Sequence, residues 1–419
     1  MPFKTISIIG LGYIGLPTAA VFASRKLKVV GVDINQQTVD TINRGQIHIV
    51  EPDLDMVVHA AVTEGYLRAT TTPEPADAFL IAVPTPFKTG AGQGTCPEPD
   101  LSHIQAAANA IAPVLAPGNL VILESTSPVG ATEQLAQWLA EARPDLTFPQ
   151  TQGEESQIRI AHCPERVLPG QVLRELVHND RVIGGLTPQC SRAACELYSV
   201  FLKGECIATN ARTAEMCKLT ENSFRDVNIA FANELSIICD QLDINVWELI
   251  RLANRHPRVN ILQPGPGVGG HCIAVDPWFI VSSAPEQAQL IRTAREVNDA
   301  KPEWVVQKVR QEVERFVSAN PEKAEQDVTV ACFGLAFKPD IDDLRESPAL
   351  DITKRLVEEG QFKVIAVEPN IQKRNVAGIE VVSLEQGLQA DVLVLLVDHK
   401  PFKRFKPECG FVVDTRGVW

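Results

Sequence analysis

The chain of 419 residues is 45% hydrophobic and 22% charged, which is ordinary for a soluble globular protein. Its length allows two or three domains of roughly 100–200 residues each, and no run reaches the ~18 apolar residues of a membrane span, so we expect a cytoplasmic protein. The formal net charge of −13 argues against nucleic acid or an anionic membrane as the main partner, since both favour basic surfaces.

Strands and helices alternate in the N-terminal part. Short apolar runs predict strands at Ile6–Ile9, Val29–Val32, Phe79–Val83, Leu120–Leu123 and Ile158–Ala161, and Leu16–Ser24 predicts a helix. Uninterrupted apolar runs are typical of strands buried on both faces, as in a parallel sheet that is covered by helices.

A long helix is predicted over Ala211–Leu242, a stretch with almost no Gly or Pro and with apolar residues at helical spacing. A helix of about 30 residues spans roughly 45 Å, so it can join two domains and offer a surface for dimerisation. Phe224 and Phe231 on this helix are expected to be considerably buried.

The C-terminal part repeats the early pattern. Strands are predicted at Val328–Phe333, Val364–Val367, Val392–Val397 and Phe411–Val413, and a helix at Leu350–Glu359. The run DAFLIAV at Asp77–Val83 resembles DVLVLLV at Asp391–Val397. We therefore predict an α/β protein with two doubly wound, Rossmann-like domains joined by the long central helix. The expected divisions are residues 1–210, a helical dimerisation region at 211–315, and 316–419.

A GxGxxG pattern at Gly10, Gly12 and Gly15 follows a predicted strand and opens a helix. Glycines at these positions allow a tight turn and the close approach of a pyrophosphate, which the helix N-terminus attracts. Asp33 ends the next strand, where a carboxylate can bind a ribose diol and would repel a 2′-phosphate. The pattern predicts NAD rather than NADP; the alternative is a packing turn with a solvated Asp.

The second α/β domain has Gly334 at the matching turn but lacks the GxGxxG pattern. It can therefore keep the fold without a second dinucleotide site. Arg416 follows the last strand and is either an anion contact of the substrate or an ordinary surface residue.

Cys272 lies in a loop that carries Gly265, Gly267, Gly269 and Gly270. Such a bare loop lets a substrate approach the backbone, and it exposes a thiol better than a core does. The loop favours a nucleophilic cysteine over a buried hydrophobic one. The ten cysteines show no CxxC pair and no metal-ligand spacing, so we expect reduced thiols and no metal site.

Lys218, Asn222 and Arg225 share one face of the predicted long helix. A solvated stripe is the usual reason for such a face, but a partly buried lysine beside an asparagine can steady negative charge on an oxygen. Glu165 either activates water or forms an ion pair in its loop. Further positive charge comes from separated clusters that could converge on a diphosphate, namely Arg166, His256 with Arg258, and Lys338 with Arg345.

Eight ordered runs give the chain a resemblance to the UDP-glucose/GDP-mannose dehydrogenase family over essentially its whole length. They are GLGYIGLPTA, AVPTPF, ESTSPVG, CPERVLPG, AEMCKLTENSFRDVNIAFANEL, NRHPRVN, GPGVGGHCIAVDPW and FGLAFKPDIDDLRESPA. CPERVLPG, RDVNIAFANEL and NRHPRVN are most similar to the branch that acts on UDP-N-acetyl-D-mannosamine. The resemblance implies oxidation to the uronate with two NAD, for enterobacterial common antigen synthesis.

The resemblance also implies roles for the matching residues. Cys272 would be the nucleophile and Lys218 the acid/base or oxyanion-stabilising group, with Asn222, Asp276, Glu165 and Thr126 assisting or positioning water. Contacts to NAD are implied for Tyr13, Ile14, Asp33, Thr85 and Thr126, with Arg345 nearby. Contacts to the sugar nucleotide are implied for Arg166, Val167, Lys218, Asn222, Arg225, His256, Arg258, Gly269, Phe337 and Lys338. Family members are dimers or larger assemblies built on the central helices.

Two questions stay open at this point. Sequence patterns do not separate the manno from the gluco epimer, so UDP-N-acetylglucosamine and UDP-glucose remain alternatives, as do a two-electron hydroxyacid-type NAD dehydrogenase and a non-enzymatic NAD-binding scaffold. The loop Lys88–Pro97 is longer and richer in glycine than the family pattern requires, and the direction of its effect on NAD affinity is open.

Overall fold

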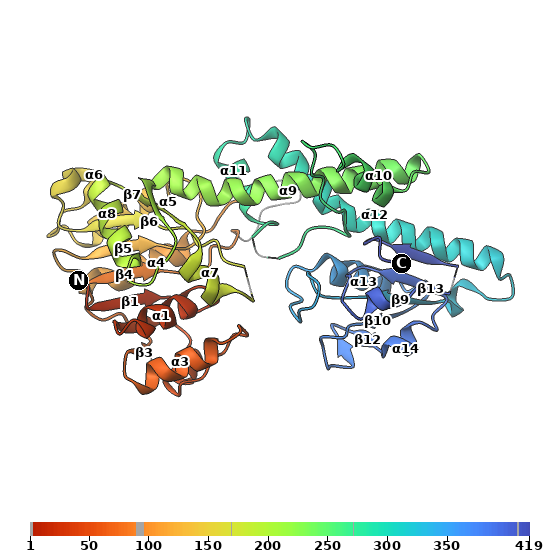
Figure 1. Cartoon of the computed structure of the whole chain (residues 1–419), viewed down its shortest axis with the longest axis horizontal. Coiled ribbons are helices and arrows are strands. Elements are labelled where there is room, and N and C mark those ends of the chain that lie inside the picture. Colours follow the sequence, from red (N-terminus) through yellow and green to blue (C-terminus); the bar gives the residue numbers. More distant parts are fainter. Residues whose placement is uncertain (1–2, 89–95, 169, 271, 409) are drawn as a thin grey trace. The chain divides into compact units, whose positions relative to one another are not determined.

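The computed structural model describes residues 3–88, 96–168, 170–270, 272–408 and 410–419. The chain divides into two compact units, Met1–Glu221 and Asn222–Trp419, and each contains one sheet with helices packed on it (Figure 1). Most of the glycine-rich loop Lys88–Pro97 lies outside the described residues. Among the described residues, no helix is both long and apolar enough to cross a membrane.

The first unit is built on an eight-stranded sheet. Its strands are β1 (Thr5–Ile9), β2 (Lys28–Val32), β3 (Leu67–Thr70), β4 (Ala78–Ile81), β5 (Leu120–Leu123), β6 (Arg159–His162), β7 (Arg181–Gly185) and β8 (Cys206–Asn210). The order is β3-β2-β1-β4-β5-β6-β7-β8. Strands β1 to β6 are parallel, whereas β7 is antiparallel to β6. The first six strands have the order that is typical of dinucleotide-binding domains.

Helices cover both faces of this sheet. They are α1 (Gly15–Ser24), α2 (Gln36–Asn43), α3 (Leu54–Thr63), α4 (Ser102–Ile111), α5 (Ala131–Ala142), α6 (Pro149–Gln152), α7 (Val172–His178) and α8 (Pro188–Tyr198). Helices α1, α3, α7 and α8 pack on the face that carries Ile6 and Ile8, and α4 and α5 pack on the face that carries Val121 and Leu123. Every residue of β4 and β5 is buried, which explains why these strands read as unbroken apolar runs.

The second unit contains the end of the long helix and a smaller sheet. Its strands are β9 (Thr329–Phe333), β10 (Lys363–Val367), β11 (Asn375–Val376), β12 (Ile379–Val381), β13 (Val392–Leu395) and β14 (Val412–Asp414), in the order β11-β12-β10-β9-β13-β14. Its helices are α9 (Ala211–Gln241, which starts in the first unit), α10 (Val246–Ala253), α11 (Asp276–Ser283), α12 (Gln289–Ala319), α13 (Pro348–Glu359) and α14 (Leu384–Gly387). Helices α12 and α13 cover one face of the sheet.

The two sheets repeat the same construction, as the sequence predicts. Asp77 accepts hydrogen bonds from the backbone N–H groups of Lys4 (2.7 Å) and Thr5 (2.9 Å), so it ties the start of β4 to β1. Asp391 accepts one from the N–H of Thr329 (2.7 Å) in the same relation between β13 and β9. The predicted class, two Rossmann-like sheets with a long central helix, is confirmed; the divisions at residues 210 and 315 stay a prediction.

Several details differ from the sequence expectations, and three of them are informative. Phe224 and Phe231 are 71% and 53% exposed rather than buried, because they lie on the outward face of α9. Helix α12 is 31 residues long and lies mostly in the region expected to be helical, but it was not predicted as a single helix, since Pro302 in its middle interrupts the pattern of a regular helix. Strand β13 ends two residues earlier than expected, because the N–H groups of Leu396 and Val397 both turn to the carbonyl of Phe333.

Candidate active site

The carboxyl edge of the first sheet gathers five predicted site residues. Gly10 follows β1, Asp33 follows β2, Thr85 follows β4, Thr126 follows β5 and Glu165 follows β6. Because β1 to β6 are parallel, the carboxyl ends of these strands lie at one edge. Open α/β sheets bind their ligands at this edge.

The glycines of the first turn are needed for different structural reasons. Gly10 has φ +92°, and a Cβ there would lie 2.6 Å from the carbonyl oxygen of Ala82; a Cβ on Gly15 would lie 1.8 Å from the carbonyl oxygen of Gly10. Apart from Gly12 itself and its chain neighbours, no atom of the described residues lies within 4 Å of a Cβ built on Gly12. Packing within the protein therefore requires Gly10 and Gly15, whereas Gly12 keeps open the space through which a pyrophosphate can approach the backbone.

Asp33 holds this turn in place. Its Oδ2 accepts a hydrogen bond from the N–H of Leu11 (3.0 Å) and its Oδ1 accepts one from the N–H of Asn35 (2.9 Å). His48 lies near this carboxylate, and burial lowers the pKa of His48 below its usual 6.5 although the charge of Asp33 acts in the opposite direction. The carboxylate therefore faces a neutral imidazole and keeps lone pairs for a ribose diol.

The hydroxyl of Thr85 is a second sign of a ligand at this edge. Its Oγ1 is buried and has no hydrogen-bond partner among the described residues. Buried hydroxyls are nearly always satisfied, by protein, water or ligand. The neighbouring loops are themselves well anchored, because the hydroxyl of Ser125 donates to the carbonyl of Val83 (2.7 Å). The open face of Gly12 and the unpaired Thr85 hydroxyl both fit NAD.

Glu165 forms a buried ion pair rather than a loose loop contact. It is 8% exposed, and its Oε2 accepts a hydrogen bond from Nη2 of Arg181 at 3.1 Å. Its Oε1 accepts one from the backbone N–H of Arg166 (2.6 Å), whose side chain pairs with Glu221 at 3.3 Å. Val167 is half-buried against the core. The ion-pair alternative is therefore present, and the water-positioning role stays a prediction.

In the second unit the glycine loop packs tightly against other segments of the chain. A Cβ on Gly269 would lie 2.3 Å from the carbonyl oxygen of Glu346, and one on Gly270 would lie 3.2 Å from the ring of Phe337. Gly267 has φ +149° and faces Pro348. Internal packing thus accounts for these glycines, and the exposed side chain of Cys272 at the end of the loop agrees with the predicted accessible thiol.

The residues after Cys272 fold at once into a helix. The carbonyl of Cys272 accepts hydrogen bonds from the N–H groups of Val275 (3.1 Å) and Asp276 (2.8 Å), where α11 begins. Asp276 is 2% exposed and accepts a hydrogen bond from the side-chain amide of Asn222 at 2.5 Å. Lys218 and Asn222 are half-buried on α9, and Arg225 is exposed. The structure thus joins Asn222 and Asp276, which the sequence places 54 residues apart.

The basic residues that were predicted to bind substrate in the second unit differ in their exposure and in their partners. His256 and Arg258 are exposed on the turn after α10, and Lys338 is half-buried in the segment after β9. Arg345 pairs with Asp343 in its own loop. Arg416 is not a plain surface residue, because its Nε lies 3.0 Å from Oδ1 of Asp398 and its Nη1 lies 3.5 Å from the carbonyl oxygen of Pro264.

Comparison with known proteins decides the family. The NAD binding domain of the UDP-glucose/GDP-mannose dehydrogenase family matches residues 4–202, its central domain matches 212–300, and its UDP binding domain matches 331–419. The chain belongs to this family. As a member of it, the protein is an NAD-binding dehydrogenase, which confirms the predicted enzyme class and cofactor.

Three relatives show how close the likeness is. The chain is 66% identical over 426 residues to a UDP-N-acetyl-D-mannosamine dehydrogenase of Yersinia pestis, covering 100% of both chains. It is 65% identical over 423 residues to an NDP-N-acetyl-D-galactosaminuronic acid dehydrogenase of Ralstonia nicotianae, covering 100% of this chain and 96% of the relative. The solved UDP-D-ManNAc dehydrogenase of Pyrococcus horikoshii is 37% identical with a TM-score of 0.85, covering 99% and 96% of the two chains.

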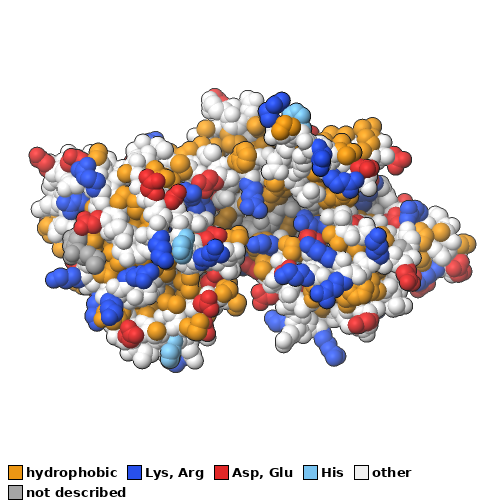
Figure 2. All heavy atoms as spheres, in the orientation of Figure 1, with side chains coloured by type: hydrophobic (Ala, Val, Ile, Leu, Met, Phe, Trp, Pro, Cys, Tyr) orange, Lys and Arg blue, Asp and Glu red, His pale blue; other side chains and the backbone are white. Residues whose placement is uncertain are grey.

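The dehydrogenase also has polar features that were not anticipated from its sequence. Arg181 and Glu124 are buried beside Glu165; a charged first residue in the apolar run RVIGG was the available signal. Among the described residues, no group of three or more His, Cys, Asp and Glu side chains could hold a metal ion. Figure 2 shows Lys and Arg side chains scattered over the visible face of both units, so the negative net charge does not exclude an anionic substrate.

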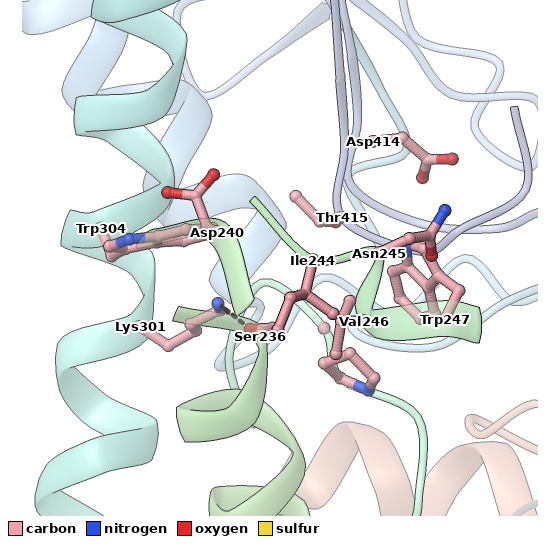
Figure 3. Close-up of a pocket in the computed structure, with 12 residues that line it drawn as sticks. Ser236, Asp240, Ile244, Asn245, Val246, Trp247, Lys301, Trp304, Asp414 and Thr415 are labelled. Carbon is pink, nitrogen blue, oxygen red and sulfur yellow. Dashed lines mark hydrogen bonds between the residues drawn. The ribbon is translucent and has the colours of Figure 1, made fainter. Parts of the chain in front are cut away.

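A cavity of about 280 Å³ in the second unit was not expected either (Figure 3). Helices α9, α10 and α12 line it, together with the start of the glycine loop and the end of β14. Lys301 lies on its wall with Nζ 2.6 Å from Oγ of Ser236 and 3.6 Å from the ring centre of Trp304. Lys301 is only 2% exposed, which makes it an unusual site for an ammonium group.

Proposed function

We propose that this dehydrogenase oxidises UDP-N-acetyl-D-mannosamine to UDP-N-acetyl-D-mannosaminuronate in two steps, with Cys272 as the covalent nucleophile. Support comes from the identity of 66% over the whole length to the Yersinia pestis enzyme of that name. The structural observation that carries the proposal is the exposed Cys272 at the end of a tightly packed glycine loop. A use of the product in enterobacterial common antigen synthesis stays a prediction from the sequence resemblance.

In the first step the C6 hydroxyl of the sugar loses a proton and a hydride and becomes an aldehyde. Bound NAD supplies the hydride acceptor for each of the two oxidations. Lys218, half-buried on α9, has one of two roles in this step. It either accepts the hydroxyl proton or stabilises the negative charge that develops on the oxygen. Asn222 and Asp276 assist, and their mutual hydrogen bond keeps both side chains in one orientation.

In the second step the thiol of Cys272 adds to the aldehyde carbon and forms a thiohemiacetal. Loss of a second hydride and of the hydroxyl proton leaves a thioester on Cys272. Water, positioned by Glu165 and Thr126, then attacks the carbonyl carbon, releases the carboxylate and restores the thiol. Covalent retention keeps the reactive aldehyde on the enzyme between the two oxidations.

The ratio of NADH to sugar tests this proposal directly. Two NADH per UDP-N-acetylmannosamine, with the uronate as product, support it, because a hydroxyacid-type dehydrogenase would form one. A ratio of one, or no NADH at all, rejects it and leaves the two-electron enzyme or the scaffold. Cys272→Ala is expected to abolish uronate formation; undiminished uronate would reject the covalent step.

A second substrate has nearly equal support. The Ralstonia nicotianae relative, an NDP-N-acetyl-D-galactosaminuronic acid dehydrogenase, is 65% identical to this chain, so overall identity does not separate the two sugars. A side-by-side assay of kcat/KM with the UDP-linked N-acetyl sugars of the manno, galacto and gluco series, and with UDP-glucose, decides between them. A higher kcat/KM for any sugar other than the manno epimer would overturn the substrate assignment.

We also propose that the enzyme is a homodimer that pairs through α9. Phe224, Phe231 and Ile238 are 71%, 53% and 42% exposed and recur every seven residues, so they form one apolar stripe along the helix. Met216, eight residues before Phe224 on the same helix, is 38% exposed and lines a groove of about 440 Å³. Long helices with apolar residues at seven-residue spacing pair with a second helix of the same kind, so the occupant is a second copy.

A further inference from the structure

We propose that Arg181 positions the carboxylate of Glu165 for the hydrolytic step, and that Glu124 adjusts this hold by sharing the same guanidinium group. The inference rests on the proposed function, in which Glu165 directs water onto the thioester. It concerns only residues of the first unit.

Strand direction brings Arg181 to Glu165. Because β7 runs antiparallel to β6, with His162 opposite Gly184, the first residue of β7 lies at the edge where β6 ends. Arg181 thus reaches the loop that follows β6. Its Nη2 lies 3.1 Å from Oε2 of Glu165, and its Nη1 lies 3.4 Å from Sγ of Cys163.

The guanidinium group is held rigidly. Its central carbon lies 4.5 Å from the ring centre of Tyr198 and 5.6 Å from that of Phe201, so aromatic faces restrict its movement. Arg181 is 5% exposed, and a buried arginine keeps its charge. A fixed cation at this place gives the Glu165 side chain one orientation, with its second oxygen on the N–H of Arg166.

Glu124 competes for the same cation. Its Oε1 lies 3.9 Å from Nη1 of Arg181 and accepts a hydrogen bond from the hydroxyl of Tyr198 at 2.5 Å. Its Oε2 is buried and has no hydrogen-bond partner among the described residues. Two buried carboxylates therefore share one guanidinium group, a combination that leaves one negative charge in excess when both are ionised.

The proton on Glu124 is the variable element of this cluster. Burial raises the pKa of Glu124 to about 7, although Arg181 acts in the opposite direction. Burial also raises the pKa of Cys163 to about 11 and holds that of Tyr198 well above its usual value, so neither adds charge at neutral pH. When Glu124 is protonated, Arg181 forms an ion pair with Glu165 alone. When Glu124 is ionised, both carboxylates interact with Arg181.

A charge-balanced variant tests the positioning role. Loss of Arg181 alone would leave two buried carboxylates together and endanger folding. The double variant Arg181→Met/Glu124→Gln removes one cation and one anion, and it keeps Glu165. We expect its kcat to fall about tenfold or more with a smaller change in KM, and the Cys272 acyl adduct to accumulate in intact-protein mass spectra during turnover.

The single variant Glu124→Gln tests the adjustment. It keeps an acceptor for Tyr198 and leaves Arg181 to Glu165 at every pH. We expect kcat of the wild-type enzyme to change near pH 7 and the pH profile of this variant to lack that change. A profile equal to that of the wild type would overturn the role of Glu124, and wild-type kcat without adduct in the double variant would overturn that of Arg181.

Two further variants separate positioning from general loss of stability. Arg143→Met removes another structural arginine of the first unit, which donates to the carbonyls of Ala112 (2.8 Å) and Leu115 (2.7 Å). It should be destabilised but keep wild-type kcat without adduct; adduct there would overturn the inference. If the double variant does not fold, Arg181→Lys takes its place and should show a smaller loss of kcat with some adduct. Wild-type kcat without adduct in Arg181→Lys would then reject the positioning role of Arg181. Failure of the proposed function shows separately, as wild-type enzyme that forms fewer than two NADH per sugar.

Discussion

The side-chain amide of Asn222 donates a hydrogen bond to Oδ2 of Asp276, and this bond ties α9 to the turn that begins at Cys272. Asp276 is 2% exposed, so a lost donor leaves a buried acceptor less well satisfied. We expect Asn222→Ala to lower the free energy of unfolding by about 1–3 kcal/mol. We also expect kcat to fall by about tenfold or more, because the carboxylate of Asp276, which assists the proposed reaction, loses the bond that fixes its orientation.

Urea denaturation and steady-state NADH formation check this prediction. Asn228→Ala is the matched control, since Asn228 lies on the same helix and its side chain donates to the carbonyl of Phe224 one turn earlier. An equal fall of kcat in both variants would mean that the helix, and not the bond to Asp276, matters.

Two glycines of the dinucleotide turn should respond differently to alanine. Gly15→Ala places a Cβ 1.8 Å from a backbone oxygen, so the turn must shift and the protein should lose stability. The methyl group of Gly12→Ala meets no atom of the described residues within 4 Å, its chain neighbours aside, so this variant should fold normally. Its methyl group would instead occupy the space of the pyrophosphate, so we expect the Kd for NAD to rise about tenfold or more.

Thermal unfolding without ligand and titration with NAD separate the two effects. The expected pattern is a lower Tm for Gly15→Ala alone, and for Gly12→Ala an unchanged Tm with weaker binding. Wild-type affinity in Gly12→Ala would contradict the placement of the pyrophosphate at this turn.

Much of the fold is predictable because it depends on local pattern. Strand β5 was placed at its observed bounds, Leu120–Leu123, since a strand buried on both faces must be apolar at each residue. The likeness between Asp77–Val83 and Asp391–Val397 also indicated the repeat, because the same Asp-to-backbone bonds begin β4 and β13. Gly10 and Asp33 were placed correctly at one sheet edge, since their spacing is that of one βαβ unit.

Features that depend on long-range pairing were not predictable. The bond between Arg181 and Glu165 requires β7 to run antiparallel to β6, which no residue pattern indicated. Phe224 was predicted to be buried because it is hydrophobic, but it is exposed. An exposed apolar face can instead be an interaction surface for another protein chain. The loop glycines Gly267 and Gly269 were explained by substrate access, but the ring of Pro348 crowds both positions, and the carbonyl oxygen of Glu346 also crowds Gly269.

The apolar stripe on α9 gives a prediction about assembly. Phe224→Glu/Phe231→Glu places two charges on a face that a second copy is proposed to cover, and buried unpaired charges are strongly unfavourable. We expect the variant to be a folded monomer by sedimentation velocity at a concentration at which the wild type is a dimer. Val50→Glu, at a position 79% exposed in the first unit, should leave the dimer intact. A dimeric double variant would rule out α9 as the interface.

Lys301 gives a prediction about stability and pH. Burial lowers the pKa of Lys301 from 10.5 to about 7, with Asp240 opposing the shift. Between pH 7 and 10.5 the unfolded chain therefore binds a proton that the folded protein does not, so the free energy of unfolding rises with pH over this range. The cost of burying the ammonium group is fully present below pH 7 and is lost towards pH 10.5.

Removing this ammonium group should therefore stabilise the enzyme at neutral pH. We expect Lys301→Met to raise the free energy of unfolding at pH 7 by an amount on the order of a few kcal/mol. The loss of the hydrogen bond to Ser236 offsets part of this gain. The gain should shrink at pH 9.5, because the wild type has by then shed most of the cost. Urea denaturation of both proteins at the two pH values checks this. Lys363→Met is the control, since Lys363 is 61% exposed and pairs with Glu380; a gain for Lys301→Met at pH 9.5 as large as at pH 7 would show that Lys301 is not the group that titrates.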